Sequence, residues 1–118
     1  MPEHKPVRIE KPWGYELIWA HTDRYVGKIL HVRKGHALSL QYHRTKDETI
    51  HVLAGRIELQ TGDGGELERR PLDPGESFRI TAGLRHRMIA LLDSDVLEAS
   101  TPELDDVVRL EDRYGRVR

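Results

Sequence analysis

The sequence predicts an all-β fold, either a sandwich or a barrel. Short runs of apolar or alternating residues recur along the 118 residues, and each run is brief enough to be one strand. Breaks rich in glycine and aspartate separate these runs, as at residues 61–65 and 73–75. Such frequent turn signals are typical of a double-sheet architecture. The expected strands cover residues 14–20, 25–32, 37–43, 49–53, 56–60, 67–72, 77–80, 86–92 and 96–100.

The two ends of the chain differ from this pattern. Residues 1–13 contain three prolines, so we expect an extended arm there rather than a helix. In the segment 105–116, the pair Asp105 and Asp106 could cap a short helix. An extended strand that turns at Gly115 fits the same residues, and the sequence leaves both alternatives open.

Composition excludes several classes of function. The formal net charge is -1 and 33% of the residues are charged, so no basic surface for nucleic acid is expected. The absence of cysteine excludes disulfides, thiolate metal sites and cysteine nucleophiles. No apolar run approaches the roughly 18 residues of a membrane span, and no signal-like segment begins the chain. We therefore expect one cytoplasmic domain over residues 1–118 that binds neither nucleic acid nor membrane.

The stretch from residue 35 to residue 55 contains three side chains that can bind a divalent metal. Gln41 and His43 are two residues apart, so on a strand they share one face. Glu48 follows after a polar break, and a hairpin there would bring it opposite the first two. A polar face that lines a barrel interior needs partners, and a metal would supply them. The alternative is a solvent-exposed polar face with the neighbouring leucines in the core.

The same stretch resembles the first motif of the cupin family. The spacing of glycines and ligands fits, with Gln41 standing where most cupins carry a histidine. A second cupin motif follows at residues 75–86, with Thr81 in place of the usual proline. The resemblance implies a cupin fold, which is a double-stranded β-helix or jelly-roll barrel, with His86 as a further ligand. One divalent ion is then expected on Gln41, His43, Glu48 and His86. Nitrogen and oxygen ligands without sulfur suit Zn, Mn, Fe, Co or Ni.

Three segments are similar to the cupin domain of type II mannose-6-phosphate isomerases, which is usually fused to a mannose-1-phosphate guanylyltransferase. They are residues 11–15, 38–43 and 106–116. The resemblance implies metal-dependent conversion of mannose 6-phosphate to fructose 6-phosphate through an enediolate, here by a standalone domain. Lys46 departs from the family, which has an arginine there that can make bidentate contacts. No glycine-rich nucleotide loop occurs in these 118 residues, so we expect no guanylyl transfer.

An aldose–ketose isomerase needs a base for the C2 proton and cations for the phosphate. The candidate bases are Lys46, which we would test first, and Glu98. The candidate phosphate ligands are Lys11, Arg109 and Arg116, and the last two fall within the family's C-terminal signature. A solvated basic tail is the alternative interpretation of these arginines.

Two other functions fit the same motifs. One is a non-catalytic cupin that binds a sugar or sugar phosphate, which the changed loop between His43 and Glu48 favours. The other is a different metal-dependent cupin enzyme, such as an oxygenase that uses iron at the same ligands. A shared fold does not decide among them.

The pattern around the ligands also predicts self-association. Leu38, Leu40 and Tyr42 alternate with the polar residues of their strand, so they would form an exposed apolar patch on the barrel. We expect a two-fold symmetric homodimer that buries this patch. Alternatively, the arm or the C-terminal segment of the same chain covers it. We expect Trp13 to anchor the arm to the barrel.

Overall fold

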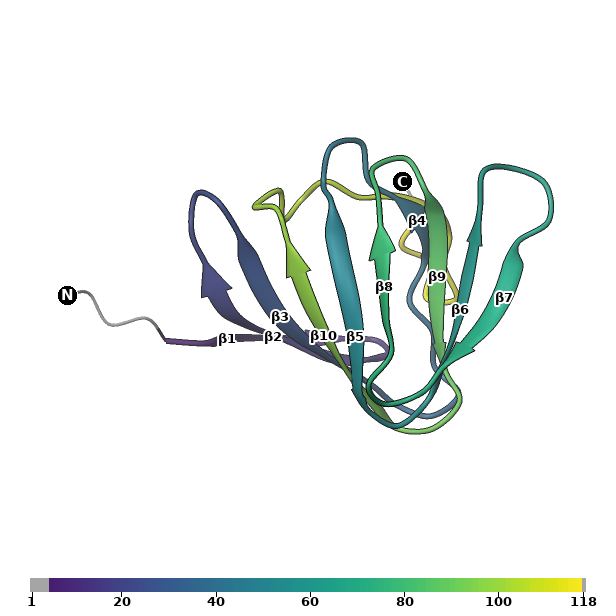
Figure 1. Cartoon of the computed structure of the whole chain (residues 1–118), viewed down its shortest axis with the longest axis horizontal. Coiled ribbons are helices and arrows are strands. Elements are labelled where there is room, and N and C mark those ends of the chain that lie inside the picture. Colours follow the sequence, from purple (N-terminus) through teal and green to yellow (C-terminus); the bar gives the residue numbers. More distant parts are fainter. Residues whose placement is uncertain (1–4, 118) are drawn as a thin grey trace.

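Two antiparallel β-sheets make up the computed structural model, which describes residues 5–117 (Figure 1). The first sheet contains, in spatial order, β1 (Val7–Lys11), β2 (Gly14–His21), β3 (Val26–Val32), β10 (Ser94–Ser100), β5 (Glu48–Ala54) and β8 (Ser77–Ile80). The second contains β11 (Val108–Glu111), β4 (Leu40–Tyr42), β9 (Arg85–Ala90), β6 (Ile57–Gly62) and β7 (Glu68–Leu72). The predicted all-β jelly-roll architecture is therefore confirmed, because from β3 onward the chain passes repeatedly between the two sheets.

The strand predictions hold to within a few residues, with one exception. The run at residues 37–43 forms a strand only over β4, while Ala37 makes a single bridge to Ile89. In the predicted arm, residues 7–11 are extended and pair with β2 as β1. Residues 1–4, the start of that arm, lie outside the described residues.

The C-terminal segment contains no helix in the part of the chain that the structure describes, so the helix alternative is wrong. Residues 108–111 instead form β11, which pairs with β4 (Figure 1). Pairing with a neighbouring strand overrides the local capping signal of the two aspartates. The carboxylate of Asp106 accepts hydrogen bonds from backbone N–H groups near residue 45 rather than from a helix.

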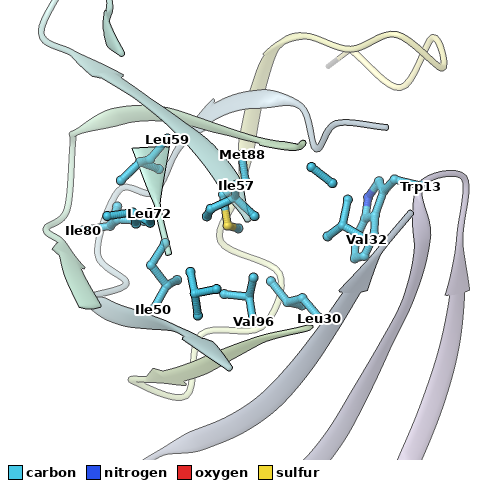
Figure 2. Close-up of a cluster of buried hydrophobic side chains, with 12 residues drawn as sticks. Trp13, Leu30, Val32, Ile50, Ile57, Leu59, Leu72, Ile80, Met88 and Val96 are labelled. Carbon is cyan, nitrogen blue, oxygen red and sulfur yellow. The ribbon is translucent and has the colours of Figure 1, made fainter. Parts of the chain in front are cut away.

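Inward-facing side chains divide the barrel interior into an apolar half and a polar half. Along β5, Glu48 is followed on the same face by Ile50 and Val52, both fully buried. Inward-facing residues likewise change from polar to apolar along β9, from His86 to Met88. The apolar half consists of Trp13, Leu30, Val32, Ile50, Val52, Ile57, Leu59, Leu72, Ile80, Met88, Ala90 and Val96 (Figure 2). Trp13 belongs to this cluster, which confirms that it anchors the end of β1 to the barrel.

Gly55 makes the turn between β5 and β6 possible. Its φ is 87°, and a Cβ there would lie 2.3 Å from the carbonyl oxygen of Asp93. Only glycine combines this left-handed backbone with so close a neighbour. The crossover from the ligand strand β5 in the first sheet to β6 in the second sheet therefore depends on this residue.

The predicted apolar patch around β4 is wrong. Leu40 is buried within the chain, and Leu38 packs against the core cluster because the strand alternation breaks before β4. The exposed large apolar side chains include Trp19, Tyr25 and Leu53 instead. The homodimer itself stays a prediction.

Candidate metal centre and adjoining cavity

Three side chains from three strands or strand ends meet in the polar half of the barrel. His43 follows β4, Glu48 begins β5 and His86 lies on β9. The Nε2 atoms of His43 and His86 each lie 3.4 Å from Oε1 of Glu48, and the three side chains are almost completely buried. One ligand atom from each residue can be chosen so that all lie within 4.8 Å of one another. This spacing suits three ligands around one ion.

Hydrogen bonds at Nδ1 fix the orientation and the tautomer of both histidine rings. Nδ1 of His43 contacts the backbone carbonyl of Asp106, and Nδ1 of His86 lies 2.9 Å from the carbonyl of Leu84. A carbonyl only accepts, so Nδ1 carries the proton in each ring and Nε2 presents a lone pair. Neither Nε2 has a hydrogen-bond partner although both are buried. Two buried lone pairs facing a carboxylate fit a divalent cation, and backbone-oriented histidines are usual around metals.

Gln41 is well placed to be the fourth ligand that the sequence predicts. It pairs directly with His86 across β4 and β9. Its side-chain oxygen accepts a hydrogen bond of 2.6 Å from the hydroxyl of Ser39, which leaves a second lone pair on that oxygen.

The two predicted catalytic residues lie beside these ligands. Nζ of Lys46 is 3.1 Å from Oε2 of Glu48 and 3.0 Å from Oε2 of Glu98. Burial alone would lower the pKa of Lys46, but the charges of Glu98 and Glu48 raise it above its ordinary value. Burial raises the pKa of Glu98, and Lys46 only partly opposes that shift. Burial alone would also raise the pKa of Glu48, whereas the charge of Lys46 lowers it.

Asp106 fixes the loop that carries His43 and Lys46. Its carboxylate accepts backbone hydrogen bonds from Arg44 at 2.9 Å, Thr45 at 2.7 Å and Lys46 at 2.9 Å. Partial burial alone would raise the pKa of Asp106, but these bonds outweigh it and lower the pKa to about 2. The C-terminal segment therefore clamps the ligand loop in place.

A cavity of about 90 Å³ lies next to this group. The three predicted phosphate ligands line it together with Gln41, His43, Lys46 and Glu98. Burial lowers the pKa of Lys11, and the charge of Glu16 only partly opposes this shift. The charges of Lys28, Arg109 and Arg116, which line the same cavity, lower it further. Seven of the nine predicted site residues thus line the cavity, and Glu48 and His86 lie next to its wall at His43. The full lining is Lys11, Trp13, Glu16, Lys28, Leu30, Leu38, Gln41, His43, Lys46, Glu98, Leu104, Val107, Arg109 and Arg116.

Sequence reasoning missed Glu16, Lys28 and Asp106. A signal for Lys28 exists, because it falls between Val26 and Leu30 on the apolar face of an alternating run. A charged residue on such a face needs a partner or a function. No local signal marks the role of Asp106, since the residues it contacts are about 60 positions away in the sequence.

The fold and the site together define a small jelly-roll barrel with a candidate metal centre in its polar half. The chain belongs to the cupin family, since the cupin domain matches residues 28–98. The cupin resemblance of the two motifs is therefore confirmed. Among the described residues, no helix is long and apolar enough to cross a bilayer.

Known relatives extend the likeness over almost the whole chain. It is 39% identical over 122 residues to mannose-1-phosphate guanylyltransferase of Escherichia coli (strain K12), covering 98% of this chain and 24% of that protein. It is 34% identical over 115 residues to xanthan biosynthesis protein XanB of Xanthomonas campestris pv. campestris (strain B100), covering 92% and 24%. The chain thus spans about a quarter of the length of these relatives. Among solved structures, KdgF from Halomonas sp. matches with a TM-score of 0.72 and 26% identity, covering 86% of this chain and 89% of that one.

Proposed function

We propose that this cupin is a metal-dependent sugar-phosphate isomerase that interconverts mannose 6-phosphate and fructose 6-phosphate. The observation that carries the proposal is one cavity lined by two of the candidate metal ligands, Gln41 and His43, by a buried lysine–glutamate pair and by a group of cations, with Glu48 and His86 beside His43. An open-chain sugar phosphate needs these three features, because it has a reacting carbonyl end and an anionic end. The resemblance of three segments to type II mannose-6-phosphate isomerases supports the same substrate.

The residues that would hold the metal are Gln41, His43, Glu48 and His86. A divalent ion there would act as a Lewis acid on the C1 and C2 oxygens of the open-chain sugar. Glu48 is the only anion in this set, so the bound ion keeps a net positive charge. Mixed nitrogen and oxygen ligands fit zinc, manganese, iron, cobalt or nickel.

We assign the proton transfer between C2 and C1 to Glu98 and a charge-stabilising role to Lys46. Lys46 lies between two buried carboxylates, an arrangement that favours its ammonium form and makes it a poor base. It can instead stabilise negative charge that develops on the sugar oxygens. Glu98 is buried beside the cavity and carries the carboxylate that can accept and return a proton. The sequence analysis put Lys46 before Glu98 as the candidate base, and this assignment reverses that order.

The phosphate group would bind to Lys11, Arg109 and Arg116 at the cavity wall. Arg116 is held by Asp112 through bonds of 2.9 and 3.1 Å, which orients its guanidinium. These three cations line one cavity, and a dianion bound there would relieve their mutual repulsion.

Metal analysis combined with a coupled assay for fructose 6-phosphate tests this proposal. We expect about one divalent ion per chain in the purified protein and none in His86→Ala, because the variant loses one of the buried ligands. Turnover of mannose 6-phosphate should follow the metal content. A protein that refuses every first-row divalent ion would contradict the metal centre.

A non-catalytic sugar-phosphate-binding cupin is the second candidate, and Lys46 favours it. A lysine already engaged by two carboxylates has less freedom to contact a substrate than a bidentate arginine would have. Tight binding of mannose 6-phosphate by the metal-loaded protein without turnover would select this function. Oxygen uptake by the iron-loaded protein would select an oxygenase.

A further inference from the structure

A second buried ion pair lines the cavity and has no part in the proposed chemistry. Nζ of Lys28 on β3 lies 3.5 Å from Oε2 of Glu16 on β2. The residues are 6% and 9% exposed, so both charges are nearly withdrawn from bulk water. Both side chains reach the same cavity as His43 and Lys46.

Stability alone does not explain this pair. Withdrawing two charges from water costs about as much as their attraction returns, and an apolar pair of similar volume is often as stable or more stable. The neighbouring cavity wall is apolar at Trp13, Leu30 and Leu38, so such a replacement would suit the surroundings. The pair therefore points to a ligand that needs a donor and an acceptor there.

The strand order shows which part of a ligand this pair would meet. Glu48, Glu98, Lys28 and Glu16 lie on the adjacent strands β5, β10, β3 and β2. Lys28 is directly opposite Glu98 in the pairing of β3 with β10. Neighbouring strands are about 4.8 Å apart, so the backbones of β3 and β2 lie roughly 10 to 14 Å from that of β5, and the side chains of Lys28 and Glu16 reach from there into the cavity that they share with His43. Lys28 and Glu16 also line the same cavity as Lys11.

We infer that Glu16 and Lys28 form a subsite for the hydroxyl groups in the middle of a hexose phosphate chain. A carboxylate accepts hydrogen bonds from hydroxyls, and an ammonium donates to their oxygens, so the pair complements neighbouring hydroxyls. A ligand with its carbonyl at the metal group and its phosphate at Lys11 places its middle carbons against the pair. The inference rests on the proposed function for the orientation of the ligand. It assigns the recognition of the sugar hydroxyls, as distinct from the carbonyl and the phosphate, to Glu16 and Lys28.

Calorimetric binding by the full chain as purified tests the subsite without requiring turnover. The probes are mannose 6-phosphate and inorganic phosphate, which lacks the hydroxyl chain. Glu16→Gln and Lys28→Met should each weaken mannose 6-phosphate binding about tenfold or more, the usual effect of losing a hydrogen bond to a charged group. Phosphate binding should fall at least fivefold less in each variant. The exposed Glu10→Gln and Lys34→Met serve as matched controls and should bind both probes as the wild type does.

The double variant Glu16→Gln with Lys28→Met separates ligand binding from folding. It leaves neither charge buried without its partner, so its stability should recover relative to the single variants. Persistent selective loss of mannose 6-phosphate binding supports the subsite. The subsite is overturned if the double variant recovers mannose 6-phosphate binding or if the variants lose both probes equally. It is also overturned if the wild type does not prefer mannose 6-phosphate to phosphate. If the preference is present but the metal-loaded protein shows no turnover, the isomerase function fails and the subsite stands.

Discussion

Replacing Asp106 with asparagine should lower the free energy of unfolding by about 2–3 kcal/mol, because hydrogen bonds to a charged group each contribute about 1.5–3 kcal/mol. The carboxylate accepts three backbone hydrogen bonds, at 2.9, 2.7 and 2.9 Å. Asparagine has nearly the same size, but it has no charge and only one side-chain oxygen. The loss stays below the sum of three bonds, since the backbone at Arg44 and Thr45 is exposed and water can replace the carboxylate there. Lys46 is buried, and its N–H is the one most affected.

The same variant predicts a pH dependence of the stability difference. The folded pKa of Asp106 is lowered to about 2 from an ordinary value of 3.8. Between these values the unfolded chain binds more protons at this group than the folded chain does. The stabilisation by Asp106 is therefore fully present above the ordinary pKa and is lost as the pH falls through the folded pKa. The difference between wild type and Asp106→Asn should be constant near pH 6 and should shrink below about pH 4.

Loosening the loop should also weaken metal binding. His43 lies at the start of the clamped loop and donates its Nδ1 proton to the Asp106 carbonyl. Loss of an outer partner of a metal ligand typically lowers metal affinity about 10- to 100-fold, and we expect the lower end because the carbonyl itself is retained.

Urea unfolding at pH 6 and pH 3, together with metal titration, tests this reasoning. Asp105→Asn is the matched control, because Asp105 is the exposed neighbour and should change neither quantity. A stability at pH 6 within about 0.5 kcal/mol of the wild type, the size of an ordinary surface change, would refute the clamp.

Two further predictions concern stability and use the same urea measurements. Lys46→Met should cost about 3–5 kcal/mol because it leaves two buried carboxylates without their cation, whereas Lys46→Arg should stay within about 1.5 kcal/mol of the wild type. Equal losses in both variants would contradict the ion-pair account. Gly55→Ala should cost about 2 kcal/mol or more, because of its φ of 87° and the contact of 2.3 Å with the Asp93 carbonyl. Gly35→Ala, with a φ of 82° but no atom within 4 Å of the added Cβ, should lose less, and an equal loss would show that the contact is unimportant.

The strands and the candidate ligands were predictable because their signals are local. Alternation and turn residues mark most strands to within a few positions. The spacing of Gln41, His43 and Glu48 in the sequence does not depend on where the strands begin and end. His86 required a second motif, since it lies on a distant strand that only the fold brings beside the first. The resemblance to the second cupin motif identified His86 as a ligand, which strand periodicity alone could not do.

Long-range pairing explains the predictions that failed. The segment after Asp106 has equal local reasons to be helix or strand, and pairing of β11 with β4 decides between them. Strict alternation predicts that Leu38, before β4, and Leu40, within it, point outward. That alternation breaks at Ser39, where the backbone leaves the strand geometry, and Leu38 turns towards the core.

The divided interior explains how a chain with only 37% hydrophobic residues can hold so many buried charges. The apolar half contains the packed cluster that stabilises the barrel, and it draws on β3, β5, β9 and β10, which also carry Lys28, Glu48, His86 and Glu98 (Figure 2). Each of those strands is therefore held at its apolar end, while its polar end is free to present a costly group such as Glu48 or Glu98. Lys46 offsets part of that cost by pairing with both carboxylates, but the lone pairs of His43 and His86 have no partner within the described chain. Because a cation that binds only the folded chain adds its binding free energy to stability, the polar half is the part of the barrel whose stability depends most on its ligands.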